Sequence, residues 1–148
     1  MSHQDQDTEQ SLFLLIKRTS KAFRERLNNN FVKEGYDITS AQWRILKCLW
    51  CTDGQIQQDL ANVVHQDKTS ITRIVDSMEK RDLVVRIPDK SDRRQNLIYM
   101  TNKGKRLQEE LMQIFHKTSL EVQEGINPEQ LEIFKKVLAE IYSNLTNQ

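Results

Sequence analysis

The feature that most constrains the fold is a change in the spacing of apolar residues near residue 82. Over residues 66–81 the apolar side chains recur at helical spacing, as Ile71, Ile74, Val75 and Met78. From residue 83 to residue 100 they alternate instead, in two short runs separated by the charged stretch from Pro88 to Gln95. This pattern predicts a helix followed directly by a β-hairpin.

Helical spacing also precedes and follows this segment. It extends over about residues 9–33, 39–50, 56–64, 101–122 and 128–145. Thr39 and Gln42 form a capping-box signature, and Thr101 is expected to cap one long helix behind the hairpin. The predicted fold class is mainly α with a small β-hairpin (α+β).

Two consecutive helices followed by a hairpin make a winged helix-turn-helix. We assign it to residues 37–106, with residues 66–81 as the recognition helix and long helices at both ends of the chain. The charges agree with a separate role for this middle part, although the formal net charge of the chain is only +1. Residues 65–106 hold eleven basic and six acidic side chains, a local charge of +5, so the rest sums to −4. A basic middle predicts a face that meets an anion.

The outer face of the predicted recognition helix carries side chains that suit the major groove of DNA. Glutamine pairs with adenine, arginine binds guanine or phosphate, and serine or threonine hydroxyls hydrogen-bond to either kind of base edge. Gln66, Thr69 and Arg73 lie on that face, and Lys68, Ser70 and Thr72 flank it. We expect Lys68 to bind phosphate and the others to read or position bases. The alternative is an ordinary solvated helix face.

The predicted hairpin tip carries two adjacent arginines, Arg93 and Arg94. Such a wing reaches into a neighbouring minor groove, where narrow A·T tracts concentrate negative potential. Asp92 lies two residues before Arg94, so these side chains are expected to pair and to orient Arg93 toward DNA. Which arginine enters the groove stays open. The alternative is a loop whose mixed charge only keeps the protein soluble.

The run LVVRIPDKSDRRQNLIYMTNKG, residues 83–104, resembles the wing of the MarR family (multiple antibiotic resistance regulators). The family pattern reads hydrophobic-x-R, then D-x-R, then hydrophobic-x-hydrophobic-T-x-x-G. This chain matches it with Asp92, Arg94, Ile98, Met100, Thr101 and Gly104. Upstream, ITSAQWRILKCL and QQDLANVVHQDKTSITRIVDSMEKRDLV resemble the family's second helix and its helix-turn-helix. The resemblance covers about residues 11–145.

The resemblance implies a sequence-specific DNA-binding transcriptional regulator. Members of the family are homodimers that bind pseudo-palindromic operators in double-stranded DNA, usually as repressors, and many release DNA when a small phenolic or other ligand binds. By resemblance, the ligand site would lie near Phe23, Trp43 and Leu46. Residues 1–36 and 107–148 would form a helical dimerisation region. The long apolar stripes of the terminal helices also predict a dimer, because one winged helix cannot cover them.

Cys48 and Cys51 form a C-x-x-C on the second predicted helix, near Arg44 and Lys47, whose charges would lower a thiol pKa. One alternative function is therefore a thiol-based redox-sensing regulator, set against two ordinary thiols. A disulfide between these helix positions would be strained. A second alternative is a winged-helix protein-interaction module without DNA binding.

Other classes of protein are not expected. His3, His65 and His116 do not complete a zinc site with the two cysteines, so neither a metal nor a cofactor is predicted. His65 is expected to be a turn residue or to face a phosphate. Nothing resembles a nucleophile–base pair or a glycine-rich phosphate loop, which argues against an enzyme. The longest apolar run, residues 12–16, is too short to span a membrane, and residues 1–10 lack a signal-peptide pattern. A cytoplasmic protein is therefore expected.

Overall fold

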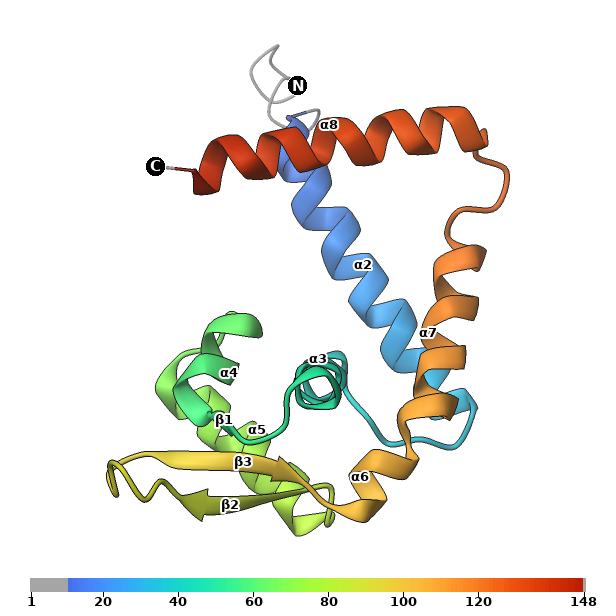
Figure 1. Ribbon diagram of the computed structural model, residues 1–148. Coiled ribbons are helices and arrows are strands. Elements are labelled where there is room, and N and C mark those ends of the chain that lie inside the picture. The colour runs from blue at the N-terminus through green and yellow to red at the C-terminus, as the bar shows by residue number, and fades with distance from the viewer. Residues whose placement is uncertain (1–10, 148) are drawn as a thin grey trace, which may run out of the picture. The chain divides into compact units, whose positions relative to one another are not determined.

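The computed structural model describes residues 11–147, which fall into two compact units, one ending at Thr118 and one beginning at Ser119. Helices dominate both units, and the first also holds a small sheet (Figure 1). The elements are α2 (Leu12–Lys33), α3 (Ser40–Cys51), β1 (Gln55–Ile56), α4 (Gln57–Val63), α5 (Lys68–Lys80), β2 (Val84–Pro88), β3 (Asn96–Met100), α6 (Asn102–Arg106), α7 (Gln108–Glu121) and α8 (Pro128–Thr146). His3 and the expected helical residues 9 and 10 lie outside the described part of the chain.

Side-chain caps mark the starts of α3 and α5, among other helices. The Gln42 amide donates to the Thr39 hydroxyl at 3.2 Å, and the Thr39 amide donates to Gln42 Oε1 at 3.1 Å, which confirms the predicted capping box. The carboxylate of Asp67 accepts from the Ser70 amide at 2.7 Å. The recognition helix α5 therefore begins at Lys68 and not at residue 66.

The sheet has three antiparallel strands in the order β1–β3–β2. Strands β2 and β3 form the predicted hairpin, in which Arg86 pairs with Ile98 and Ile87 pairs with Leu97. Strand β1 adds Gln55–Ile56 to the other edge of β3. Two residues are too few to show alternation, so the sequence does not predict β1.

The hydrophobic core of the first unit draws side chains from most of its helices and from the sheet. The recognition helix contributes Ile71, Val75 and Met78, and β3 contributes Ile98 and Met100. Burial of such apolar surface stabilises the fold by about 25 cal/mol per Å². Helix α5 is therefore held by its inner face, which leaves its outer face to solvent.

The single long helix expected behind the hairpin is broken in two. Thr101 does cap a helix, since its hydroxyl accepts from the Gly104 amide at 3.1 Å, but α6 ends at Arg106. In a continuous helix the Gly104 carbonyl would accept from the amide of residue 108. It accepts instead from Trp50 Nε1, on α3, at 3.2 Å. This partner is 54 residues away, and the local pattern gives no sign of it.

Helix α8 makes up most of the second unit, and none of its residues is buried. Its exposed large apolar side chains are Ile133, Phe134, Val137, Tyr142 and Leu145. Within residues 11–147, no helix is both long and apolar enough to cross a membrane.

Candidate nucleic-acid interface

The outer face of α5 is polar and open to solvent. Lys68, Thr69 and Arg73 are exposed, and Ser70 and Thr72 are half-buried. Gln66 lies in the turn before the helix, where its amide donates to the Ala61 carbonyl at 2.9 Å. His65 forms that turn with a φ of +53°, as expected of a turn residue. The predicted contact residues thus lie together on one stretch of chain.

The hydroxyl of Thr72 is already engaged within the protein. It donates to the Lys68 carbonyl at 2.8 Å and accepts from Gln57 Nε2, on α4, at 3.1 Å. A hydroxyl has one proton, so in this arrangement Thr72 cannot donate to a base. One lone pair of the hydroxyl stays available to accept from a base, so the predicted contact of Thr72 with DNA stays a prediction. The two bonds also give Thr72 a role in holding α5 against α4.

Asp67 caps the N-terminus of α5. Hydrogen bonds from the Ser70 amide and hydroxyl hold the pKa of the Asp67 carboxyl below its usual value, while partial desolvation opposes them. A negative charge at this position also favours the helix dipole. The start of the recognition helix is therefore fixed by an ionised side chain.

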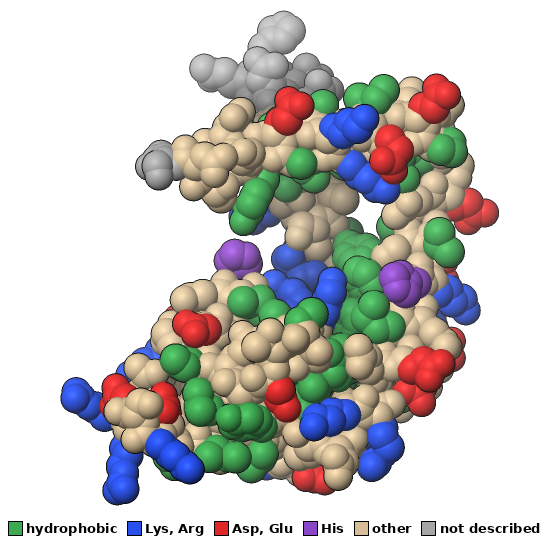
Figure 2. Space-filling view, viewed as in Figure 1, with side chains coloured by type: hydrophobic (Ala, Val, Ile, Leu, Met, Phe, Trp, Pro, Cys, Tyr) green, Lys and Arg blue, Asp and Glu red, His purple; other side chains and the backbone are tan. Residues whose placement is uncertain are grey.

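The loop between β2 and β3 is closed by hydrogen bonds and an ion pair. Asp92 Oδ1 accepts from the Arg94 amide at 3.1 Å and lies 3.6 Å from Arg94 Nε, which confirms the predicted pairing. The Arg94 side chain nevertheless stays 95% exposed, and Arg93 is exposed as well. Figure 2 shows basic side chains projecting from the end of the molecule where this loop lies.

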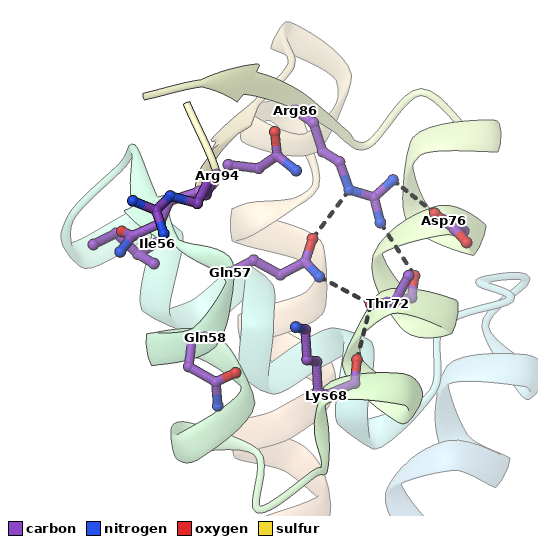
Figure 3. Close-up of a pocket in the computed structure, with 10 residues that line it drawn as sticks. Ile56, Gln57, Gln58, Lys68, Thr72, Asp76, Arg86 and Arg94 are labelled. Carbon is purple, nitrogen blue, oxygen red and sulfur yellow. Dashed lines mark hydrogen bonds and ion pairs between the residues drawn. The ribbon is translucent and has the colours of Figure 1, made fainter. Parts of the chain in front are cut away.

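An open cleft of about 510 Å³ separates the start of α5 from the wing (Figure 3). Its lining includes Lys68 from α5, Gln57 and Gln58 from α4, and Arg94 and Asn96 from the wing. Of these, the sequence indicates only Lys68 and Arg94. Gln57, Gln58 and Asn96 are not predicted, because glutamine and asparagine are ordinary surface residues. Only the fold brings these three side chains to one cleft.

Arg86, on β2, binds both helices of the helix-turn-helix (Figure 3). Its Nη1 atom lies 2.7 Å from Asp76 Oδ1 and 3.2 Å from Glu79 Oε1, both on α5. Its Nη2 atom donates to the Thr72 carbonyl at 3.2 Å, and its Nε atom donates to Gln57 Oε1 at 3.0 Å. The Arg86 side chain is only 18% exposed. The sequence predicts no contact for Arg86; it shows only that Arg86 occupies the arginine position of the wing pattern.

Comparison with known proteins agrees with this geometry. The model of the MarR family matches residues 38–95. The HTH-type transcriptional regulator FarR of Neisseria gonorrhoeae is 33% identical over 106 residues, which cover 71% of this chain and 72% of FarR. The chain belongs to the MarR family. It is accordingly a transcriptional regulator that binds DNA.

Solved structures that share this fold include two other transcriptional regulators. The transcriptional repressor CouR, bound to a 23-mer DNA duplex, superposes with a TM-score of 0.79 at 21% identity, over 92% of this chain and 95% of CouR. The PcaV transcriptional regulator from Streptomyces coelicolor, in complex with its natural ligand, has a TM-score of 0.76 at 20% identity, over 93% of this chain and 95% of PcaV. At this level of identity the likeness shows the fold.

A cluster of aromatic rings in this MarR-family chain joins α2, α3 and α7. Phe115, on α7, has its ring centroid 6.0 Å from that of Phe23 and 5.3 Å from that of Trp43. The Nζ atom of Lys47 lies 5.2 Å from the Phe115 centroid. The structure thus brings Phe23 and Trp43 together, whereas Leu46 is fully buried in the core.

Arg44, on α3, is a second cation on the helix that carries Trp43. Its Nε atom is buried and has no hydrogen-bond partner among the described residues. Burial lowers the pKa of Arg44, the positive charge of Arg24 lowers it further, and Cys48 opposes both. A buried donor without a partner is rare in folded proteins. The sequence indicates Arg44 only as a neighbour of the thiols.

The two cysteines are free; Cys48 is half-buried and Cys51 is exposed. Burial raises the pKa of the Cys48 thiol and so does Cys51, while Lys47 and Arg44 act in the opposite direction by less. The nearby cations thus act on the Cys48 pKa in the expected direction, but burial outweighs them and the pKa is raised. Across the described residues, no group of three or more histidines, cysteines or acids could hold a metal ion.

Proposed function

We propose that this MarR-family regulator is a homodimer that represses transcription from a pseudo-palindromic operator until a small ligand releases it. The observation that carries the proposal is that the start of α5 and the wing border one open cleft (Figure 3). A duplex could then meet a helix in its major groove and an arginine in its minor groove together. CouR, which has the same fold, was solved on DNA.

The contact residues divide by chemistry. Gln66, Thr69, Ser70, Thr72 and Arg73 read or position bases, and Lys68 binds phosphate. Arg93 or Arg94 enters the minor groove, with Asp92 as the support of Arg94. Both arginines are exposed at the wing tip, which supports this assignment.

The dimer is proposed to form through residues 1–36 and 107–148, of which residues 1–10 and 148 are outside the described part. Exposed apolar side chains on α2 and α8 support it, among them Phe13 at 62% and Leu145 at 65% exposure. Such surface is costly to leave in water. Two recognition helices would then enter successive major grooves about 34–36 Å apart.

The ligand site is assigned to the aromatic cluster of Phe23, Trp43 and Phe115, with Arg44 and Lys47. The rings offer flat apolar surface, and the unpartnered Arg44 Nε offers a donor to an anion. We therefore propose a ligand with an aromatic or other apolar body and one negative charge. PcaV, solved with its natural ligand, shares the fold.

The test is a gel shift on the DNA upstream of the protein's own gene, with random duplex of equal length as competitor. We expect a sequence-selective shift that small aromatic carboxylates abolish and the matching neutral amides do not. Arg44→Leu should lose this ligand response and keep the operator affinity. Equal binding to both duplexes would overturn the operator proposal, and equal release by acids and amides would overturn the assigned ligand charge.

We assign no catalytic activity, metal or cofactor to this chain, and we place it in the cytoplasm, where a regulator meets its operator. The redox alternative loses support because the pKa of Cys48 is raised, which disfavours the reactive thiolate. The interaction-module alternative gives way to the family, whose members regulate transcription.

A further inference from the structure

We infer that Arg86 is a positioning residue, which holds the wing and the recognition helix in the one relative placement that lets both contact DNA. The inference rests on the proposed function. Arg86 belongs to β2, yet its side chain ends among residues of α4 and α5. It therefore joins the two parts of the protein that must reach two different grooves.

All three guanidinium nitrogens of Arg86 make contacts within the protein. Nη1 binds the carboxylates of Asp76 and Glu79, Nη2 binds the Thr72 carbonyl, and Nε binds Gln57. Its backbone amide adds a hydrogen bond to Glu79 Oε2 at 3.0 Å. Because these partners come from two helices, they fix the strand in position and in rotation.

A further hydrogen bond links the contacts of Arg86 to the residues of α5 that are proposed to read DNA. Gln57, held by Arg86, donates to the Thr72 hydroxyl, and Thr72 precedes Arg73 on the exposed face of α5. On the other side, β2 leads directly into the loop that carries Arg93 and Arg94. A loosened Arg86 would thus let the wing tip move relative to Arg73.

Geometry, and not charge, is the property that this role requires. Asp76 and Glu79 offset the positive charge of Arg86, whose side chain is 18% exposed and contributes little to the field at a phosphate. A lysine carries its charge at one point and cannot reproduce a fork of contacts to two helices. Arg86→Lys should therefore lose the placement of the wing against α5, as replacement by a neutral residue does.

The experiment is a mutant cycle on the full-length dimer, with operator affinity measured by fluorescence anisotropy over a range of salt. The variants are Arg86→Gln, Arg86→Lys, the wing double variant Arg93→Ala with Arg94→Ala, and the triple variant with Arg86→Gln. We expect Arg86→Gln, Arg86→Lys and the wing double variant each to lose about tenfold in affinity. The triple variant should fall no more than about threefold below the wing double variant, because the wing contact is already lost.

The salt dependence separates positioning from a merely structural role. If Arg86 acts through the wing, Arg86→Lys should flatten the slope of log affinity against log salt as the wing double variant does, although it removes no charge. A wild-type slope and affinity in Arg86→Lys would overturn the inference. The inference would also be overturned if the triple variant lost about a hundredfold in operator affinity, which is the product of the two separate tenfold losses.

The unfolding midpoint of each variant is measured alongside, so that loss of fold is recognised. If Arg86→Gln does not fold, Gln57→Ala replaces it, since this change removes one contact of Arg86 and spares both ion pairs. It should lose affinity non-additively with the wing double variant, and additive loss would contradict the inference. If wild-type protein binds operator and random DNA equally, the proposed function itself fails, and this result is distinct from a failure at Arg86.

Discussion

The backbone of Gly104 lies directly against the carbonyl oxygen of Leu83, so that a Cβ atom on Gly104 would overlap that oxygen. Leu83 precedes the first wing strand, and Gly104 lies in the short helix that follows the second. The Gly104 carbonyl also accepts from Trp50 Nε1, on α3. One glycine therefore brings both ends of the wing together and ties them to the helical body.

Gly104→Ala should destabilise the protein, because a methyl group at this position forces the backbone of the wing base apart. We expect a loss of about 1–3 kcal/mol in the free energy of unfolding, measured with urea. Asn102→Ala, at an exposed position of the same helix, is the matched control and should change stability far less. Equal stability of Gly104→Ala and wild type would contradict the close approach of Gly104 to the Leu83 carbonyl oxygen.

The sequence predicts most of the fold because its signals are local. The helical spacing of Ile71 to Met78 and the alternation around Ile98 locate α5 and the hairpin, and the Thr39 capping box locates the start of α3. What it misses is set by contacts between distant residues. The break behind α6 depends on the bond from Trp50 to Gly104, and the two-residue strand β1 exists only because β3 lies beside it.

The candidate site was predictable to a similar extent. Charged residues at a loop tip, such as Arg93 and Arg94, stand out in the sequence. The engaged hydroxyl of Thr72 and the four partners of Arg86 do not, because they depend on which side chains of α4 and β2 meet α5. The unpartnered nitrogen of Arg44 likewise appears only when burial is known.

Arg73 is the residue of α5 whose loss should most reduce specific binding. If it makes a bidentate contact to a base, Arg73→Ala should cost about 1–3 kcal/mol of operator binding and leave random-DNA binding little changed. The measurement is a pair of anisotropy titrations at one salt concentration. Lys33→Ala, at an exposed position outside the helix-turn-helix, is the control. Equal losses on both duplexes would show that Arg73 contacts phosphate.

The wing arginines should contribute mainly to the electrostatic part of the affinity. Replacing Arg93 and Arg94 together by alanine should weaken operator binding and reduce the slope of log affinity against log salt, by about 1 for each arginine that neutralises a phosphate. Lys33→Ala with Lys117→Ala also removes two exposed charges and should leave the slope unchanged. An unaltered slope in the wing variant would rule out its proposed contact.

Cys48 should be the slower of the two thiols to react at neutral pH. Its pKa is raised, chiefly by burial, so the thiolate becomes abundant only above the ordinary thiol pKa of about 8.5. The folded protein holds this proton more tightly than the unfolded chain. The resulting stabilisation is present below the unfolded pKa and is lost as the pH rises through the folded value.

Alkylation by iodoacetamide, followed by mass spectrometry between pH 6 and about pH 10, measures this difference. Cys51 serves as the internal reference, and a Cys48→Ser variant identifies its signal. Faster reaction of Cys48 than of Cys51 at neutral pH would contradict the raised pKa and revive the redox alternative.

Whether α5 and the wing read an operator is measured by anisotropy titration of the wild-type dimer. The two duplexes are the DNA upstream of its own gene and a random sequence of equal length, compared at physiological salt. We expect the upstream duplex to bind at least about a thousandfold more tightly than the random one. Equal affinity for the two duplexes would contradict this expectation.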